Sequence, residues 1–179
     1  MGTITRSFAN QITATGVNSI ADGTIVNADI NASAAIAGSK LTGVGKVLQV
    51  VTGTDSTERN TTSTSFVTSS NTLSISITPS SASNKVFVVV NTGFFKATGG
   101  SGFLTIYRGA SNLGGAGGMT QVQQAFYNSS CISYLDSPSS TSALTYQLYF
   151  RSSDANPIYI NSNNGGGLIC SLTAFEIAG

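Results

Sequence analysis

Apolar and polar residues alternate over short stretches of the chain from residue 46 onward. In Thr72–Thr78, leucine and isoleucine alternate with serine and threonine, and this spacing of two predicts a strand with one buried face. Lys85–Val90 is a nearly continuous apolar run, which predicts a strand covered on both faces. The predicted strands are Lys46–Val51, Thr64–Thr68, Thr72–Thr78, Lys85–Val90, Phe103–Arg108, Gln121–Tyr127, Cys131–Leu135, Ala143–Phe150, Pro157–Ile160 and Leu168–Ile177.

Turn-forming residues separate these predicted strands, as in Pro79–Asn84 with its proline, serines and asparagine. Many short strands divided by such turns are typical of antiparallel sandwiches and jelly rolls. We therefore expect residues 46–179 to form an all-β head, an antiparallel β-sandwich or jelly roll.

The first 45 residues follow a different pattern, in which aliphatic residues recur about every five positions. A helix needs spacings of three and four, and a half-buried strand needs two, so this period fits neither. Small residues fill the intervals, and such a segment buries little by itself. It becomes ordered if several copies wind around one axis, and the isoleucines argue against the alternative of a solvated tail. The predicted stem positions are Ile20, Ile25, Ile30, Ile36 and Leu41.

The amino-acid composition excludes several classes of function. Only 15 of 179 residues are charged, with a net charge of +1, so we expect no nucleic-acid partner. The chain has no histidine, which excludes histidine metal ligands and a histidine general base. It has no apolar run of about 18 residues, so we expect no membrane span. We predict a non-enzymatic protein with no catalytic residue, no metal site and no cofactor.

The few charged side chains give little support to an enzyme. Asp136 and Asp154 flank the strand predicted at Ala143–Phe150, so we expect them at opposite ends of it. A glycosidase needs its two carboxyl groups within about 10 Å. Arg108 and Glu176 lie in apolar strand patterns; we expect solvated or paired strand ends, with an ion pair across a subunit interface as the alternative.

Cys131 and Cys170 are the only cysteines. We interpret them as small, buried apolar residues in separate strands, although the sequence does not fix how close they are. The first residues, Met1–Asn10, lack the apolar core of a secretion signal. We therefore expect synthesis in a cytoplasm.

Two glycine-rich segments, Asn112–Gly118 and Asn161–Gly167, interrupt the strands. Neither is followed by the Lys-Ser/Thr pair and helix of a phosphate-binding loop, so we expect them at one end of the sandwich, where binding surfaces often lie. Sugar recognition pairs aromatic faces with polar donors, and Tyr107, Phe126 and Tyr127 are candidates, although most strand aromatics belong to the core. The positions expected in exposed binding loops are Phe94, Phe95, Phe103, Asn112, Gly114, Asn163 and Asn164.

Several segments together resemble one family. NADINASAAIAGSKL, at Asn27–Leu41, is similar to a segment of tail-fibre and other virion proteins of bacteriophages, notably marine and cyanobacterial ones, where it precedes a C-terminal β-sandwich. Each segment is of low complexity, and their order and spacing carry the resemblance. The further similar segments are Ser63–Val90, Leu104–Gly117, Ser133–Ser153 and Ser171–Gly179.

The resemblance implies a homotrimeric virion protein, made in the host bacterium, with an N-terminal arm and stem over 1–45 and a β head over 46–179. In one interpretation residues 1–19 are a short anchoring arm that binds another virion protein, of the tail or the capsid shell. A host surface glycan is a candidate partner of the head, suggested by the loop aromatics. Long tail fibres usually begin with a large docking domain, whereas about 20 residues precede the shared segment here. A capsid decoration or head-fibre trimer is therefore the alternative to a short tail fibre or fibre tip.

Overall fold

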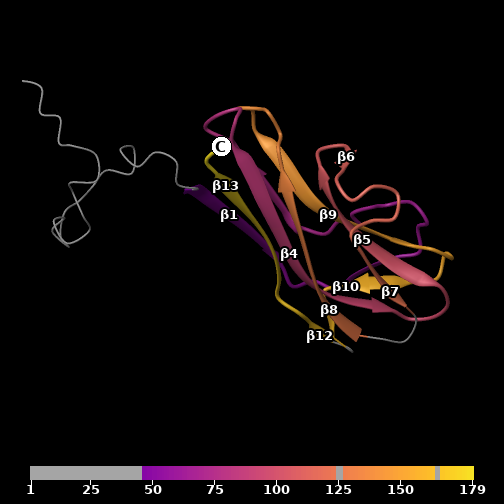
Figure 1. Ribbon diagram of the computed structural model, residues 1–179. Coiled ribbons are helices and arrows are strands. Elements are labelled where there is room, and N and C mark those ends of the chain that lie inside the picture. The colour runs from indigo at the N-terminus through magenta and orange to yellow at the C-terminus, as the bar shows by residue number, and fades with distance from the viewer. Residues whose placement is uncertain (1–45, 124–126, 164–165) are drawn as a thin grey trace, which may run out of the picture. The chain divides into compact units, whose positions relative to one another are not determined.

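The computed structural model describes residues 46–123, 127–163 and 166–179 (Figure 1). The predicted stem positions Ile20, Ile25, Ile30, Ile36 and Leu41 lie outside these residues. Within them every regular element is a strand, and no helix is present that is long and apolar enough to cross a membrane. The strands are β1 (Val47–Asp55), β2 (Arg59–Thr61), β3 (Ser74–Ile77), β4 (Lys85–Lys96), β5 (Ser101–Arg108), β6 (Ser111–Asn112), β7 (Thr120–Gln123), β8 (Tyr127–Asp136), β9 (Leu144–Ser152), β10 (Ile158–Ile160), β11 (Ser162–Asn163), β12 (Gly166–Gly167) and β13 (Cys170–Ile177).

The strands form two main sheets, and all their pairings are antiparallel. In the first sheet the order is β1-β13-β4, and β8 pairs with the other edge of β4 along its length. The last residues of β4 pair with β10, and β10 pairs with β2. In the second sheet the order is β3-β9-β5, with β7 and β6 both paired to β5. The expectation of an all-β, antiparallel fold is confirmed.

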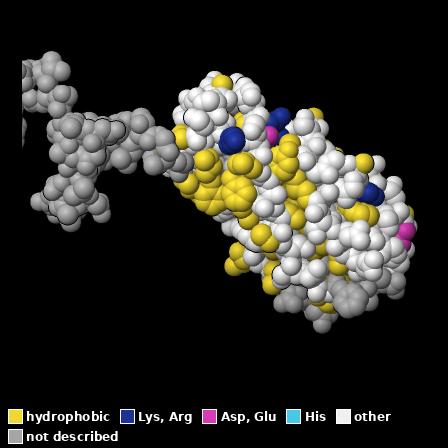
Figure 2. Space-filling view, viewed as in Figure 1, with side chains coloured by type: hydrophobic (Ala, Val, Ile, Leu, Met, Phe, Trp, Pro, Cys, Tyr) yellow, Lys and Arg dark blue, Asp and Glu magenta, His cyan; other side chains and the backbone are white. Residues whose placement is uncertain are grey.

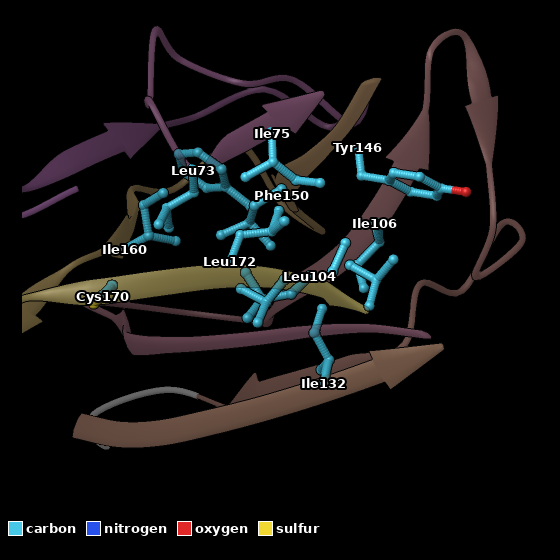
Figure 3. Close-up of a cluster of buried hydrophobic side chains, with 14 of the residues drawn as sticks. Leu73, Ile75, Leu104, Ile106, Ile132, Tyr146, Phe150, Ile160, Cys170 and Leu172 are labelled. Carbon is cyan, nitrogen blue, oxygen red and sulfur yellow. The ribbon is translucent and has the colours of Figure 1, made fainter. Parts of the chain in front are cut away.

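The hydrophobic core lies between the two sheets, as the close-up in Figure 3 shows. Alternate residues of each strand point inward, because successive side chains of a strand leave on opposite faces. In β9, Tyr146, Leu148 and Phe150 are fully buried, and in β3 Ile75 and Ile77 are nearly so. The fold is therefore β-sandwich-like, with one strand face of each sheet committed to the core.

The sequence assigns most strands correctly, but Thr64–Thr68 and Lys85–Val90 differ from the prediction. Thr64–Thr68 contains only a bridge from Val67 to Phe150. Lys85–Val90 is covered on one face rather than two, because its alternate residues Phe87 and Val89 lie half-buried on the outer side, where cross-strand neighbours shield them in part.

The prediction that both cysteines are buried is wrong for Cys131, which is exposed on β8, whereas Cys170 is buried on β13. Both thiols are free, and strand β4 separates the two cysteine-bearing strands. Cys170 Sγ accepts a hydrogen bond from the Gly93 amide at 3.4 Å. The expectation of separate strands is confirmed.

Candidate functional site

An aromatic row crosses the outer face of the first sheet. The register places Tyr159 of β10 beside Phe95 of β4, and Phe95 beside Tyr127 of β8. Asn60 of β2 continues the same row on the other side of Tyr159. All four side chains point outward because their chain neighbours, such as Phe94 and Ile158, point into the core. We name Tyr159, Phe95 and Tyr127 the aromatic row.

Ring packing fixes the geometry of this row. The rings of Phe95 and Tyr127 are stacked, with centroids 4.0 Å apart and planes 4° from parallel. The Tyr159 ring lies 5.9 Å from Phe95 at an angle of 37°. Cross-strand aromatic pairs stabilise a sheet face. Ring packing therefore fixes the orientation of these three side chains.

A shallow hollow of about 220 Å³ opens beside the aromatic row. Glu58 is exposed to solvent at this hollow, and Ser162, a buried residue with a hydroxyl group, also lines it. Ring carbons, a hydroxyl and a carboxylate in one concave surface suit a ligand with both apolar and hydroxyl groups. The residues lining the hollow are Glu58, Phe95, Ala97, Tyr127, Tyr159 and Ser162.

The structure corrects the prediction that Phe94 is exposed. Its side chain has 0% exposure and belongs to the core. Phe94 and Phe95 lie in β4 rather than in a loop, and adjacent strand residues point to opposite faces. Only Phe95 therefore reaches the outer surface, where it is half-buried.

Phe103 also lies in a strand, β5, and Arg151 covers its ring. The guanidinium carbon of Arg151 is 4.2 Å from the Phe103 ring centroid and 5.1 Å from that of Phe66. Arg151 also donates a hydrogen bond to the Ala116 carbonyl oxygen at 3.3 Å. The ring of Phe103 therefore serves a cation–π contact on the second sheet and lies apart from the aromatic row.

The predicted loop residues Asn112 and Gly114 shape a tight turn. The Asn112 side-chain oxygen accepts hydrogen bonds from Thr105 Oγ1 at 2.6 Å and from the Gly114 amide at 3.0 Å. Its nitrogen donates to the Gly115 carbonyl oxygen at 2.7 Å. Both residues are half-buried and stabilise the turn itself.

Two other predicted loop residues are described less fully. Asn163 belongs to β11 and pairs with Gly166, and its side chain is not described. Asn164 and the candidate aromatic Phe126 lie outside the described residues. The aromatic row also contains Tyr159, which the sequence reasoning missed; its place between two isoleucines in Ile158–Ile160 was the available signal for an outward ring.

Asp136 and Asp154 lie at opposite ends of β9. Asp136 accepts hydrogen bonds from Arg108 Nη1 at 2.8 and 2.7 Å and from the Tyr146 hydroxyl at 2.6 Å. Burial and this bond raise the pKa of Tyr146 well above its usual value. Arg108 is thus a paired strand-end residue, which confirms that expectation.

Asp154 belongs to a separate ion pair with Lys96. The hydrogen bond from Lys96 holds the pKa of Asp154 well below its usual value, and bonds from Asn156 and Ser152 add to that effect. The six residue-to-residue steps from Tyr146 to Ser152 span about 20 Å of strand. The two carboxylates are therefore too far apart to serve one glycosidic bond.

Glu176 differs from the expectation of a solvated or ion-paired strand end. It is 1% exposed and points inward, so an ion pair across a subunit surface does not fit it either. Neutral groups satisfy its carboxylate: Gln49 Nε2, Asn84 Nδ2, and the amide and hydroxyl of Ser80, at 2.5 to 2.8 Å. Burial alone raises the pKa of Glu176, but these hydrogen bonds outweigh it and lower the pKa to about 2.

No protein-family model matches the chain, and no curated protein matches it either.

Proposed function

We propose that this chain is a non-enzymatic structural protein of a bacteriophage particle, a homotrimeric short tail fibre or fibre tip whose head binds a host surface glycan. The observation that carries the proposal is the aromatic row, which lies at the end of the head farthest from the point where residues 1–45 join it. A fibre held by its N-terminal part presents its opposite end to the host. The sequence resemblance stated above supports the same role.

The two ends of the head follow from the strand register. Val47 begins β1 beside Ile177, and Ile177 pairs with Lys85 at the start of β4. Phe95 stands ten residues farther along β4, a distance of about 33 Å in an extended strand. The N-terminal segment therefore joins at one end of the first sheet, and the aromatic row lies at the other.

The strand order favours a jelly-roll head. The eight longer strands run β1-β13-β4-β8 in one sheet and β3-β9-β5-β7 in the other, which is the order that two interlocking Greek keys produce. Jelly rolls are frequent in viral capsid and lectin domains. This order supports both a virion protein and a sugar-binding one.

The chemistry of the hollow indicates the ligand class. A pyranose ring carries C–H groups on its faces and hydroxyls on its edges. The aromatic row offers apolar ring surface to the former, while Asn60 and the Glu58 carboxylate offer polar partners to the latter. Among the residues that the structure describes, Glu58 is the one carboxylate that lines this hollow, whereas hydrolysis of a glycosidic bond uses two. Binding without cleavage is the activity that this arrangement supports.

The position on the particle is tested by gold labelling of virions with an antibody to residues 85–179, viewed by electron microscopy. Label confined to the tail is the expected result. Label scattered over the capsid would contradict the fibre assignment and support a decoration or head-fibre trimer bound to the shell through residues 1–19. Absence of label from every particle would refute both forms of virion protein.

A further inference from the structure

An apolar strip crosses the outer face of the first sheet at the end opposite the aromatic row. The register aligns Val50 of β1, Phe175 of β13, Phe87 of β4 and Leu135 of β8 in one cross-strand row. Val50 is 54% exposed and Leu135 is 50% exposed. We name these four residues the apolar strip, and Figure 2 shows hydrophobic side chains gathered over this part of the molecule.

The surroundings of the apolar strip extend it toward the start of β1. Val47 and Leu48, at the start of β1, are 54% and 45% exposed. On the other side lies a row of uncharged side chains, in which Thr52 pairs with Thr173. Lys85 stands at the rim, paired with Ile177. An apolar centre with a polar rim is the composition of a protein interface, and contiguous apolar surface on a soluble domain commonly marks one.

Chain connectivity indicates which molecule covers the apolar strip. Residues 1–45 enter the head at Lys46, one residue before β1, and Val50 lies four residues farther, within about 14 Å along the strand. In a homotrimer joined through its N-terminal segments, this part of each head is the part tethered closest to the other two copies. Tethering raises the effective concentration of a neighbour to the millimolar range, so a second copy has the advantage over any free partner.

We propose that the apolar strip packs against the neighbouring heads of the same trimer, so that a second copy of this chain is its occupant. The inference rests on the proposed homotrimer and adds the surface through which the heads meet. A near-neutral surface is compatible with another copy of itself, because no like charges lie within the strip. The rim residue Lys85 remains at the solvent edge of the contact.

The test uses the full chain carrying Cys131→Ser, which removes the exposed native thiol, with Val50→Cys added. The matched control carries Thr54→Cys. Thr54 lies on the same face of β1 as Val50, is also exposed in a single head, and is one residue from the end of the strand. The readouts are the mass in solution, the rate of maleimide labelling, and cross-linking between copies by a short bismaleimide.

We expect a trimer in which Val50→Cys is labelled at least tenfold more slowly than Thr54→Cys and is cross-linked to a second copy. Equal labelling rates on a chain of trimer mass would overturn the strip interface and leave the proposed fibre intact. Slow labelling without cross-links would also overturn it, since the chain's own residues 1–45 would then cover the strip. A monomer mass for the parent chain would refute the trimer itself.

Discussion

The side chain of Lys96 is completely buried, and its ammonium group lies 2.8 Å from Asp154 Oδ1 at the partly exposed end of the same ion pair. The carbonyl oxygens of Thr98 and Asn156 accept its other hydrogen bonds at 2.8 and 3.0 Å. The cation therefore depends on one carboxylate and two main-chain groups of the loops that follow β4 and β9. This cluster holds in place the loops that follow β4 and β9, which lie beside the aromatic row.

Removal of the carboxylate is expected to destabilise the fold strongly. Asp154→Ala leaves the buried ammonium group of Lys96 without its anion, and a buried charge that loses its partner destabilises the folded state. Urea unfolding at constant protein concentration measures the change. Glu58→Ala, which removes an exposed carboxylate, is the control and should change the free energy of unfolding by no more than about 0.5 kcal/mol. Equal effects of the two substitutions would contradict the assigned role of Asp154.

Glu176 predicts a specific loss of stability in acid. Its pKa in the folded chain is about 2, against an ordinary value of 4.5, so its contribution is complete above pH 4.5 and declines as the pH falls toward 2. In Glu176→Gln the fold should be less stable at pH 7, and this part of the acid dependence should disappear. Unfolding free energies measured between pH 7 and pH 2 provide the check. An unchanged slope below pH 4.5 in the variant would assign the acid sensitivity to other groups.

Gly93 is predicted to tolerate no side chain. A Cβ at this position would lie 2.7 Å from the Ser162 carbonyl oxygen and 2.5 Å from Leu168 Cδ1, because the segment after β10 crosses close to β4. Gly93→Ala should therefore lower the free energy of unfolding by about 1–3 kcal/mol. Gly117→Ala is the matched control, since its Cβ would meet no atom within 4 Å. Gly93→Ala should melt at a clearly lower temperature than Gly117→Ala. Equal melting temperatures would show that the segment after β10 shifts to make room for the added methyl group.

Much of the fold could be predicted from alternation alone. In Thr72–Thr78 each apolar residue is followed by a polar one, so the phase of the strand is unambiguous, and Leu73, Ile75 and Ile77 are indeed in the core. The dipeptide Phe94-Phe95 gives no such phase, because both residues are apolar. Only the packing of β4 against the second sheet decides that Phe94 is buried and Phe95 faces outward.

The candidate site could not be assembled from the sequence for a different reason. Phe95, Tyr127 and Tyr159 come from three strands separated by about 30 residues each, and their alignment depends on the register between β4, β8 and β10. Register arises from the whole buried face of a strand rather than from any local motif. The burial of Lys96 could not be predicted either, because two of its three hydrogen-bond partners, Asp154 and Asn156, are loop residues more than 50 positions away.

The aromatic row is predicted to bind through its ring surfaces. Tyr159→Ala should weaken binding of the full chain to host cells at least tenfold. The fold should stay intact, because the Tyr159 ring is half-buried on the outer face and its removal leaves the core unchanged. Tyr149→Ala provides the matched control: Tyr149 is also half-buried in an outward aromatic stack, with Tyr107 at 3.9 Å on the second sheet. Circular dichroism verifies that both variants keep their strands.

Glycan binding by the aromatic row is tested by measuring how the fluorescently labelled full chain binds to cells of the host bacterium, with parent, Tyr159→Ala and Tyr149→Ala proteins compared at equal concentration. We expect saturable binding by the parent and the Tyr149→Ala control, competition by purified host surface polysaccharide, and at least a tenfold weaker signal for Tyr159→Ala. Equal binding by all three proteins, or binding that the polysaccharide does not compete, would contradict a glycan-binding role for the aromatic row.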